Sequence, residues 1–115
     1  MLLFYDSTPV VHTLNPIINE ISGIADSKVN PGFLWGQEDS GNPPQLHLLS
    51  HSGISSKTIY IKGAVNRDWE DLQLSNGKIY IGDIGDNNRV YNEYHFYCFS
   101  EPLMSIDTVQ SYEKI

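Results

Sequence analysis

Acidic side chains gather around one expected hairpin, and their types and spacing favour chemistry. Segment 66–88 reads NRDWEDLQLSNGKIYIGDIGDNN, two strand-like runs joined by a turn at 75–77. Carboxylates before the first strand and after the second lie at the same end of an antiparallel hairpin. The acids concerned are Asp68, Glu70, Asp71, Asp83 and Asp86. Like charges gathered in this way need a cation, a proton or solvent between them.

A calcium site is one chemistry that this end of the hairpin favours. Ca²⁺ takes six to eight oxygen ligands from carboxylates, amide side chains, backbone carbonyls and water. The predicted ligands are Glu70, Asp71, Asp83, Asp86 and Asn87. Glu70 and Asp71 point to opposite faces of a strand unless a β-bulge intervenes. The alternative is that these Asp and Asn side chains hydrogen-bond backbone amides in turns.

Two further groups of polar residues are better explained by structure than by chemistry. The loop Asp39-Ser40-Gly41-Asn42 places a serine beside an acid, but no nucleophile elbow surrounds it, so turn formation is the preferred interpretation. His47 and His51 fall on one face of an expected strand, about 13 Å apart, which is too far to share one ion. We therefore expect these histidines to be packing residues.

Composition indicates one small globular domain. The chain has 115 residues, 40% of them hydrophobic, and a formal net charge of −7. Its seven Lys and Arg residues are scattered, so we expect no nucleic-acid partner. A single cysteine, Cys98, allows no intrachain disulfide. We expect no transmembrane segment, because no apolar run is long enough, and no signal peptide, because the start lacks a basic region.

Short apolar runs between Gly- and Pro-containing turns predict an all-β fold. Helical periodicity is hard to find along the chain. The expected strands cover residues 10–14, 21–25, 33–37, 45–50, 58–62, 69–74, 78–83, 94–100 and 108–112.

Two similar units of about 45 residues divide the chain. Gly36 matches Gly82, and His47 matches Phe96, at separations typical of the four-stranded antiparallel blades of a β-propeller. We expect a single segment over 1–115, with blade one at about 20–63, blade two at about 67–115, and a leading strand and linker at 1–19. Two blades do not close a ring, so we expect a fragment of a larger propeller, partnered by the remaining blades or by self-association. A compact two-sheet sandwich is the rival architecture.

Four sequence blocks carry a resemblance to known proteins. The blocks are EISGIADSKVNPGFLWGQEDSG, GAVNRDWEDLQL, KIYIGDIGDNNR and YHFYCFSEP. Together they span about residues 20–102 and resemble uncharacterised bacterial β-propeller proteins with WED and GDIGDN blocks. Gln37 and Glu38 depart from that pattern, which has His and Asn there. The resemblance implies an extracytoplasmic or secreted protein. In form, the hairpin is also distantly similar to that of calcium-dependent six-bladed propeller hydrolases of the senescence-marker or gluconolactonase type.

These observations lead to two functional hypotheses. The first is a binding or scaffold propeller of unknown ligand, whose acidic loops brace the turns and hold a cation. The second is a calcium-dependent hydrolase of phosphoesters or lactones, with Glu70, Asp83 or Asp86 as ligands. We prefer the first, because the sequence shows no complete catalytic constellation.

Overall fold

Two β-sheets form the protein, and the described residues contain no helix. The structure is a computed structural model, and it describes residues 8–9, 11–13, 18 and 20–115. Its strands are β1 (Ile21–Asp26), β2 (Phe33–Glu38), β3 (Gln45–Ser50), β4 (Ser55–Ile61), β5 (Trp69–Ser75), β6 (Lys78–Asp83), β7 (His95–Ser100), β8 (Thr108–Val109) and β9 (Glu113–Lys114). The all-β prediction is therefore confirmed, whereas the assignment to a propeller stays a prediction.

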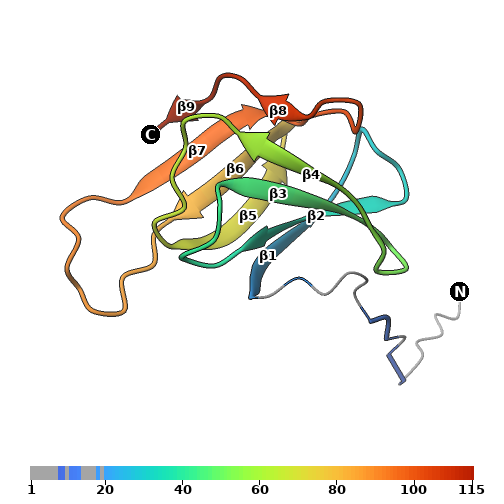
Figure 1. Cartoon of the computed structure of the whole chain (residues 1–115), viewed down its shortest axis with the longest axis horizontal. Coiled ribbons are helices and arrows are strands. Elements are labelled where there is room, and N and C mark those ends of the chain that lie inside the picture. Colours follow the sequence, from blue (N-terminus) through green and yellow to red (C-terminus); the bar gives the residue numbers. More distant parts are fainter. Residues whose placement is uncertain (1–7, 10, 14–17, 19) are drawn as a thin grey trace, which may run out of the picture.

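Each sheet is built mainly from strands that follow one another along the chain. The first has the order β1-β2-β3-β4-β8 and the second β5-β6-β7-β9 (Figure 1). Pairing is antiparallel except between β4 and β8, which run parallel. The hairpin turn at Asn76 and Gly77 has positive φ at both residues (51° and 75°), as a two-residue type I′ connection requires.

One hydrophobic core fills the space between the two sheets. It includes Trp35, Leu46 and Ile59 from the first sheet with Trp69 and Ile81 from the second, all fully buried. Alternation along each strand directs one face to this core and the other away from it. We call the face of the first sheet that points away from the core the outer face.

The prediction of one strand over residues 108–112 is wrong. Residues 108–112 were expected to form the fourth strand of the second unit, but the chain there divides between the two sheets. Thr108–Val109 joins β4 in the first sheet, because Val109 packs into the core, and Glu113–Lys114 pairs with β7 in the second. Tyr112 lies between them and packs edge-on against Tyr97, with ring centroids 5.2 Å apart.

The leading strand at 10–14 and the count of four strands in each sheet were also expected from the sequence. The described part of the expected strand 10–14, residues 11–13, is not a strand, and Val10 and Leu14 lie outside the described residues. The sheets contain five and four strands rather than four each.

The first strand of each sheet carries a β-bulge at a matching position. In β1, Ile21 and Gly23 oppose Glu38 and Gln37, which leaves Ser22 as the extra residue. In β5, Trp69 and Asp71 oppose Asp83 and Gly82, which leaves Glu70 as the extra residue. The two bulges lie 48 positions apart in the sequence, at 22 and 70. This spacing agrees with the repeat of two similar units.

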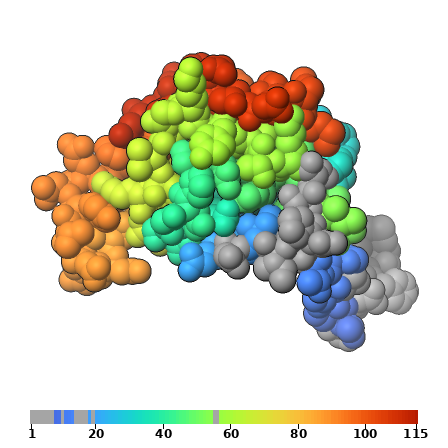
Figure 2. Space-filling view, in the orientation of Figure 1, coloured from blue at the N-terminus to red at the C-terminus, as the bar shows by residue number. Residues whose placement is uncertain are grey.

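The two bulged strands lie side by side where the sheets meet. The hydroxyl of Ser22 donates a hydrogen bond to the backbone carbonyl of Trp69 at 2.9 Å. The loop between β6 and β7 extends away from this junction, and Figure 2 shows it projecting from the body of the molecule.

Candidate metal centre

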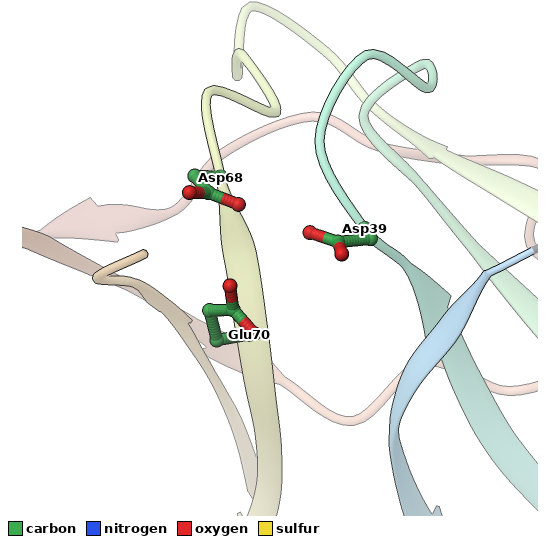
Figure 3. Close-up of side chains that lie close together, drawn as sticks. All are labelled: Asp39, Asp68 and Glu70. Carbon is green, nitrogen blue, oxygen red and sulfur yellow. The ribbon is translucent and has the colours of Figure 1, made fainter. Parts of the chain in front are cut away.

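Three carboxylates from both sheets converge at one end of the β1–β5 junction. Asp39 directly follows β2, Asp68 directly precedes β5, and Glu70 is the bulged residue of β5. One carboxylate oxygen from each lies within 4.8 Å of those of the other two. Figure 3 shows Asp39 directed across the gap toward the segment that carries Asp68 and Glu70. We call these three residues the carboxylate cluster.

The bulge gives Glu70 its position in the cluster. In a regular strand Glu70 would alternate with its neighbours and stand opposite a residue of β6. A bulge leaves the extra residue unpaired and redirects its side chain. Glu70 is half-buried, whereas the next residue, Asp71, is exposed. A bulge was the condition for Glu70 and Asp71 to share a face, and it is present, but it brings only Glu70 into the cluster.

Asn66 ties the two polypeptide segments of the cluster together. Its side-chain amide donates hydrogen bonds to the backbone carbonyls of Glu38 and Asp39, at 2.9 and 3.0 Å. Its side-chain oxygen accepts a hydrogen bond from the amide of Trp69 at 3.0 Å. The end of β2 and the start of β5 are therefore held at a fixed separation by one buried side chain.

Asp68 is the most perturbed acid of the cluster. It is 9% exposed. Burial, followed by hydrogen bonding to Asp39 and the negative charges of Glu70 and Asp39, raises its pKa from 3.8 to about 6. A cation at the cluster would favour the ionised form of Asp68 and oppose this shift.

Gly85 closes the cluster on the side of the β6–β7 loop. Its amide donates a hydrogen bond to the backbone carbonyl of Asp68 at 3.1 Å. A side chain here would collide with the carboxylates of Asp68 and Glu70, because even a Cβ atom has no room. Gly85, the second glycine of the GDIGDN block, therefore permits the loop to pack directly on the acids.

The side chains of the other predicted ligands lie outside the carboxylate cluster. Asp83 is 2% exposed and accepts a hydrogen bond from the amide of Asp68 at 2.8 Å. Asp71 accepts one from the amide of Leu72 at 2.8 Å. Asn87 is exposed. Of the five residues predicted as ligands, the structure brings only Glu70 into the cluster.

Asp86 organises the loop that follows β6. Its carboxylate accepts hydrogen bonds from the amides of Val90 (2.7 Å) and Tyr91 (3.0 Å) and from the hydroxyl of Tyr94 (2.8 Å). Partial burial alone would raise the pKa of Asp86, but these three hydrogen bonds and the charge of Arg67 outweigh it, so the pKa is lowered. This residue fits the turn-bracing interpretation made from the sequence.

Arg67 packs the same loop against the start of β5. Its guanidinium lies 3.8 Å from the ring centroid of Tyr91 and donates a hydrogen bond to the carbonyl of Glu93 at 2.8 Å.

A polar depression of about 190 Å³ lies beside the carboxylate cluster. It is lined by Ser40, Arg67, Asp68, Asp86, Asn87, Asn88, Val90 and Tyr91.

The candidate ligands named from the sequence did not include two members of the carboxylate cluster, Asp39 and Asp68. Asp68 was counted among the converging acids but was not among the predicted ligands. Asp39 was assigned to turn formation, and it does brace its turn, since its carboxylate accepts a hydrogen bond from the amide of Ser40 at 2.7 Å. The available signal was the repeat, which placed the Asp39 loop at the same end of its unit as the GDIGDN loop.

Comparison of the chain with protein-family models, with curated proteins and with solved structures finds no match. The resemblance to propeller proteins therefore stays a prediction. Across the part of the chain that the structure describes, no helix is long and apolar enough to cross a membrane.

Proposed function

We propose that this chain is a binding or scaffold module of the β-propeller type in which the carboxylate cluster holds a calcium ion. The observation that carries the proposal is the convergence of Asp39, Asp68 and Glu70 from two sheets to within 4.8 Å. Three carboxylates are hard oxygen ligands of the kind that Ca²⁺ prefers, and backbone carbonyls and water supply the remaining positions in such sites.

The position of the cluster supports a bracing role for the ion. Asp39 directly follows β2 of the first sheet and Glu70 lies on β5 of the second, so one ion would cross-link both sheets at the β1–β5 junction. Without a cation, the raised pKa of Asp68 shows that its negative charge is unfavourable there. A ligand that binds only the folded chain stabilises it in proportion to the logarithm of its concentration.

Titration calorimetry with CaCl₂ tests the proposal at pH 7, where Asp68 is mostly ionised. We expect binding to one site, with a rise in the melting temperature that Mg²⁺ does not reproduce, because Mg²⁺ dehydrates reluctantly. Asp39→Asn and Glu70→Gln should each abolish it. Asp71→Asn is the matched control, since Asp71 is adjacent to Glu70 but lies outside the cluster, and it should bind as the wild type does. If Ca²⁺ neither binds nor raises the melting temperature, the calcium proposal fails.

Exposed apolar side chains on the sheets support the expectation that further propeller blades or a second copy of the chain pack against them. Ile24 on β1, the edge strand of the first sheet, is 62% exposed, and Phe96 on β7 of the second sheet is 44% exposed. Side chains of this kind on a sheet face favour coverage by further blades or by a second copy. Sedimentation should show self-association of the isolated chain, and a stable monomer at high concentration would contradict this part of the proposal.

A further inference from the structure

Three polar side chains on the outer face of the first sheet form a hydrogen-bonded chain from hydroxyl to imidazole to carboxylate. The hydroxyl of Thr58 on β4 lies 3.2 Å from Nδ1 of His47 on β3. Nε2 of the same imidazole lies 2.6 Å from Oε1 of Glu38 on β2. The three residues come from three adjacent antiparallel strands, so the arrangement is fixed by the sheet.

Strand register explains why these three side chains meet. His47 stands directly opposite both Gly36 on β2 and Thr58 on β4. Glu38 lies two residues beyond Gly36 and therefore on the same face, diagonal to His47. Gly36 has no side chain to separate the imidazole from that carboxylate. His47 was expected from the sequence to be a packing residue; it is 7% exposed, and both of its ring nitrogens have polar partners.

The direction of the hydrogen bonds follows from the chemistry of the groups. Glu38 as a carboxylate only accepts, so Nε2 donates to it; in the neutral tautomer of the imidazole Nδ1 is then the acceptor for the Thr58 hydroxyl. A hydroxyl bonded to a neutral imidazole that is itself oriented by a carboxylate is the arrangement of an activated nucleophile. Glu38 and His47 are both buried, whereas Thr58 is exposed and open to solvent.

We propose that Thr58 is a nucleophile that accepts acyl groups from activated esters, with His47 as its general base and Glu38 as a positioning residue. Thr58 Oγ1 attacks the carbonyl carbon and forms a new C–O bond, while its proton passes to Nδ1 of His47. The ester C–O bond breaks, and the alkoxide leaves with the bonding electrons. The imidazolium then releases its proton to the leaving group or to water, which leaves an acyl ester on Thr58.

Incubation of the folded chain with p-nitrophenyl acetate, followed by peptide mass spectrometry, tests the proposal. We expect release of one equivalent of p-nitrophenolate per chain and one acetyl group on the peptide that contains Thr58. Thr58→Val removes the hydroxyl with little change of shape, so it should lose the adduct. Thr58→Ser keeps the hydroxyl and should retain it.

Two further variants examine the roles of the supporting residues. His47→Gln should slow acetylation about a hundredfold, the typical contribution of a general base. Glu38→Gln should also slow it, and ¹⁵N NMR of the His47 ring should show loss of the Nε2-protonated tautomer, a change that a purely structural role would not produce. Urea denaturation of each variant should show a cooperative transition, which confirms that the chain is still folded.

A second histidine–carboxylate pair, between His51 in the turn after β3 and Asp26 on β1, supplies the matched control. His51 Nε2 lies 2.7 Å from Oδ1 of Asp26, and no hydroxyl bonds to its other nitrogen among the described contacts. His51→Gln should therefore acetylate at the wild-type rate. Acetylation that is equal in wild type and Thr58→Val, or that maps only to His51 or to lysines, would overturn the proposal. The reaction should be insensitive to EDTA, which separates its outcome from that of the calcium proposal.

Discussion

The backbone amide of Lys28 donates a hydrogen bond of 2.8 Å to the carboxylate of Glu101, a residue 73 positions further along the chain. The same carboxylate accepts hydrogen bonds from the amide of Val29 and from the hydroxyl of Ser27. The turn between β1 and β2 is thereby bound to the segment that leaves β7. This contact connects the two sheets at a point remote from the carboxylate cluster.

Glu101→Ala should destabilise the protein by about 1–3 kcal/mol, because it leaves the buried Ser27 hydroxyl and the part-buried amides of Lys28 and Val29 without their charged acceptor. Urea denaturation at pH 7 measures this loss. Glu93→Ala is the control, because the Glu93 side chain is 79% exposed, and it should change stability by less than about 0.5 kcal/mol. Equal effects of the two substitutions would show that the Glu101 contacts contribute little.

Gly85→Ala should destabilise the chain by about 1–3 kcal/mol, the usual cost of overpacking, since its methyl group collides with Asp68 and Glu70. It should also weaken Ca²⁺ binding, because relief of the collision displaces the carboxylates. Gly82→Ala provides the comparison, since a Cβ there makes only ordinary contacts at 3.4 Å and beyond. Denaturation and calorimetry on both variants check the prediction, which a Gly85→Ala protein as stable as Gly82→Ala would contradict.

Stability in the absence of Ca²⁺ should fall as the pH rises from about 4 to 6. The pKa of Asp68 is raised to about 6 in the folded chain from 3.8, so between these values the folded state binds more protons than the unfolded state. The resulting loss is at most about 3 kcal/mol for a shift of this size. Chemical denaturation across this pH range measures it, and Asp68→Asn should remove most of the slope. Saturating Ca²⁺ should offset the loss above pH 6. A wild-type profile identical to that of Asp68→Asn would refute the assignment.

Asp86→Ala should loosen the β6–β7 loop without unfolding the sheets. Hydrogen exchange at the amides of Val90 and Tyr91 should accelerate, because both donate to the Asp86 carboxylate. Since the pKa of Asp86 is lowered, the wild-type loop should retain its protection as the pH falls toward 4 and lose it only in more acidic solution. Asp71→Ala, at an exposed position outside this loop, should leave both amides protected.

The regular parts of the fold follow from the sequence because their causes are local. The predicted bounds 45–50 and 78–83 agree with β3 and β6, whose apolar alternation lies between turn-forming residues. The division of 108–112 between two sheets was not predictable in the same way. It depends on Val109 and Tyr112 packing against residues that are distant in the sequence, and a short run carries no signal for which of two sheets it joins.

The site was predictable only in part, for a related reason. The hairpin end and Glu70 follow from strand geometry, but Asp39 reaches the cluster through the packing of one sheet on the other. The contact between His47 and Glu38 likewise depends on register between β2 and β3, which two-residue alternation alone does not set.

The paired bulges at Ser22 and Glu70 bear on how the sequences of two duplicated units diverge during evolution. Both occupy the extra position of a first strand, yet one holds a hydroxyl that donates to a neighbouring carbonyl and the other a carboxylate that faces two more acids. Duplication of one ancestral unit would supply the same backbone irregularity twice. The side chain at that irregularity is then free to diverge, because neither copy relies on it for strand pairing. The bulged position of each unit therefore accepts a new side chain, and with it a new chemistry, without any change in the pairing of the strands.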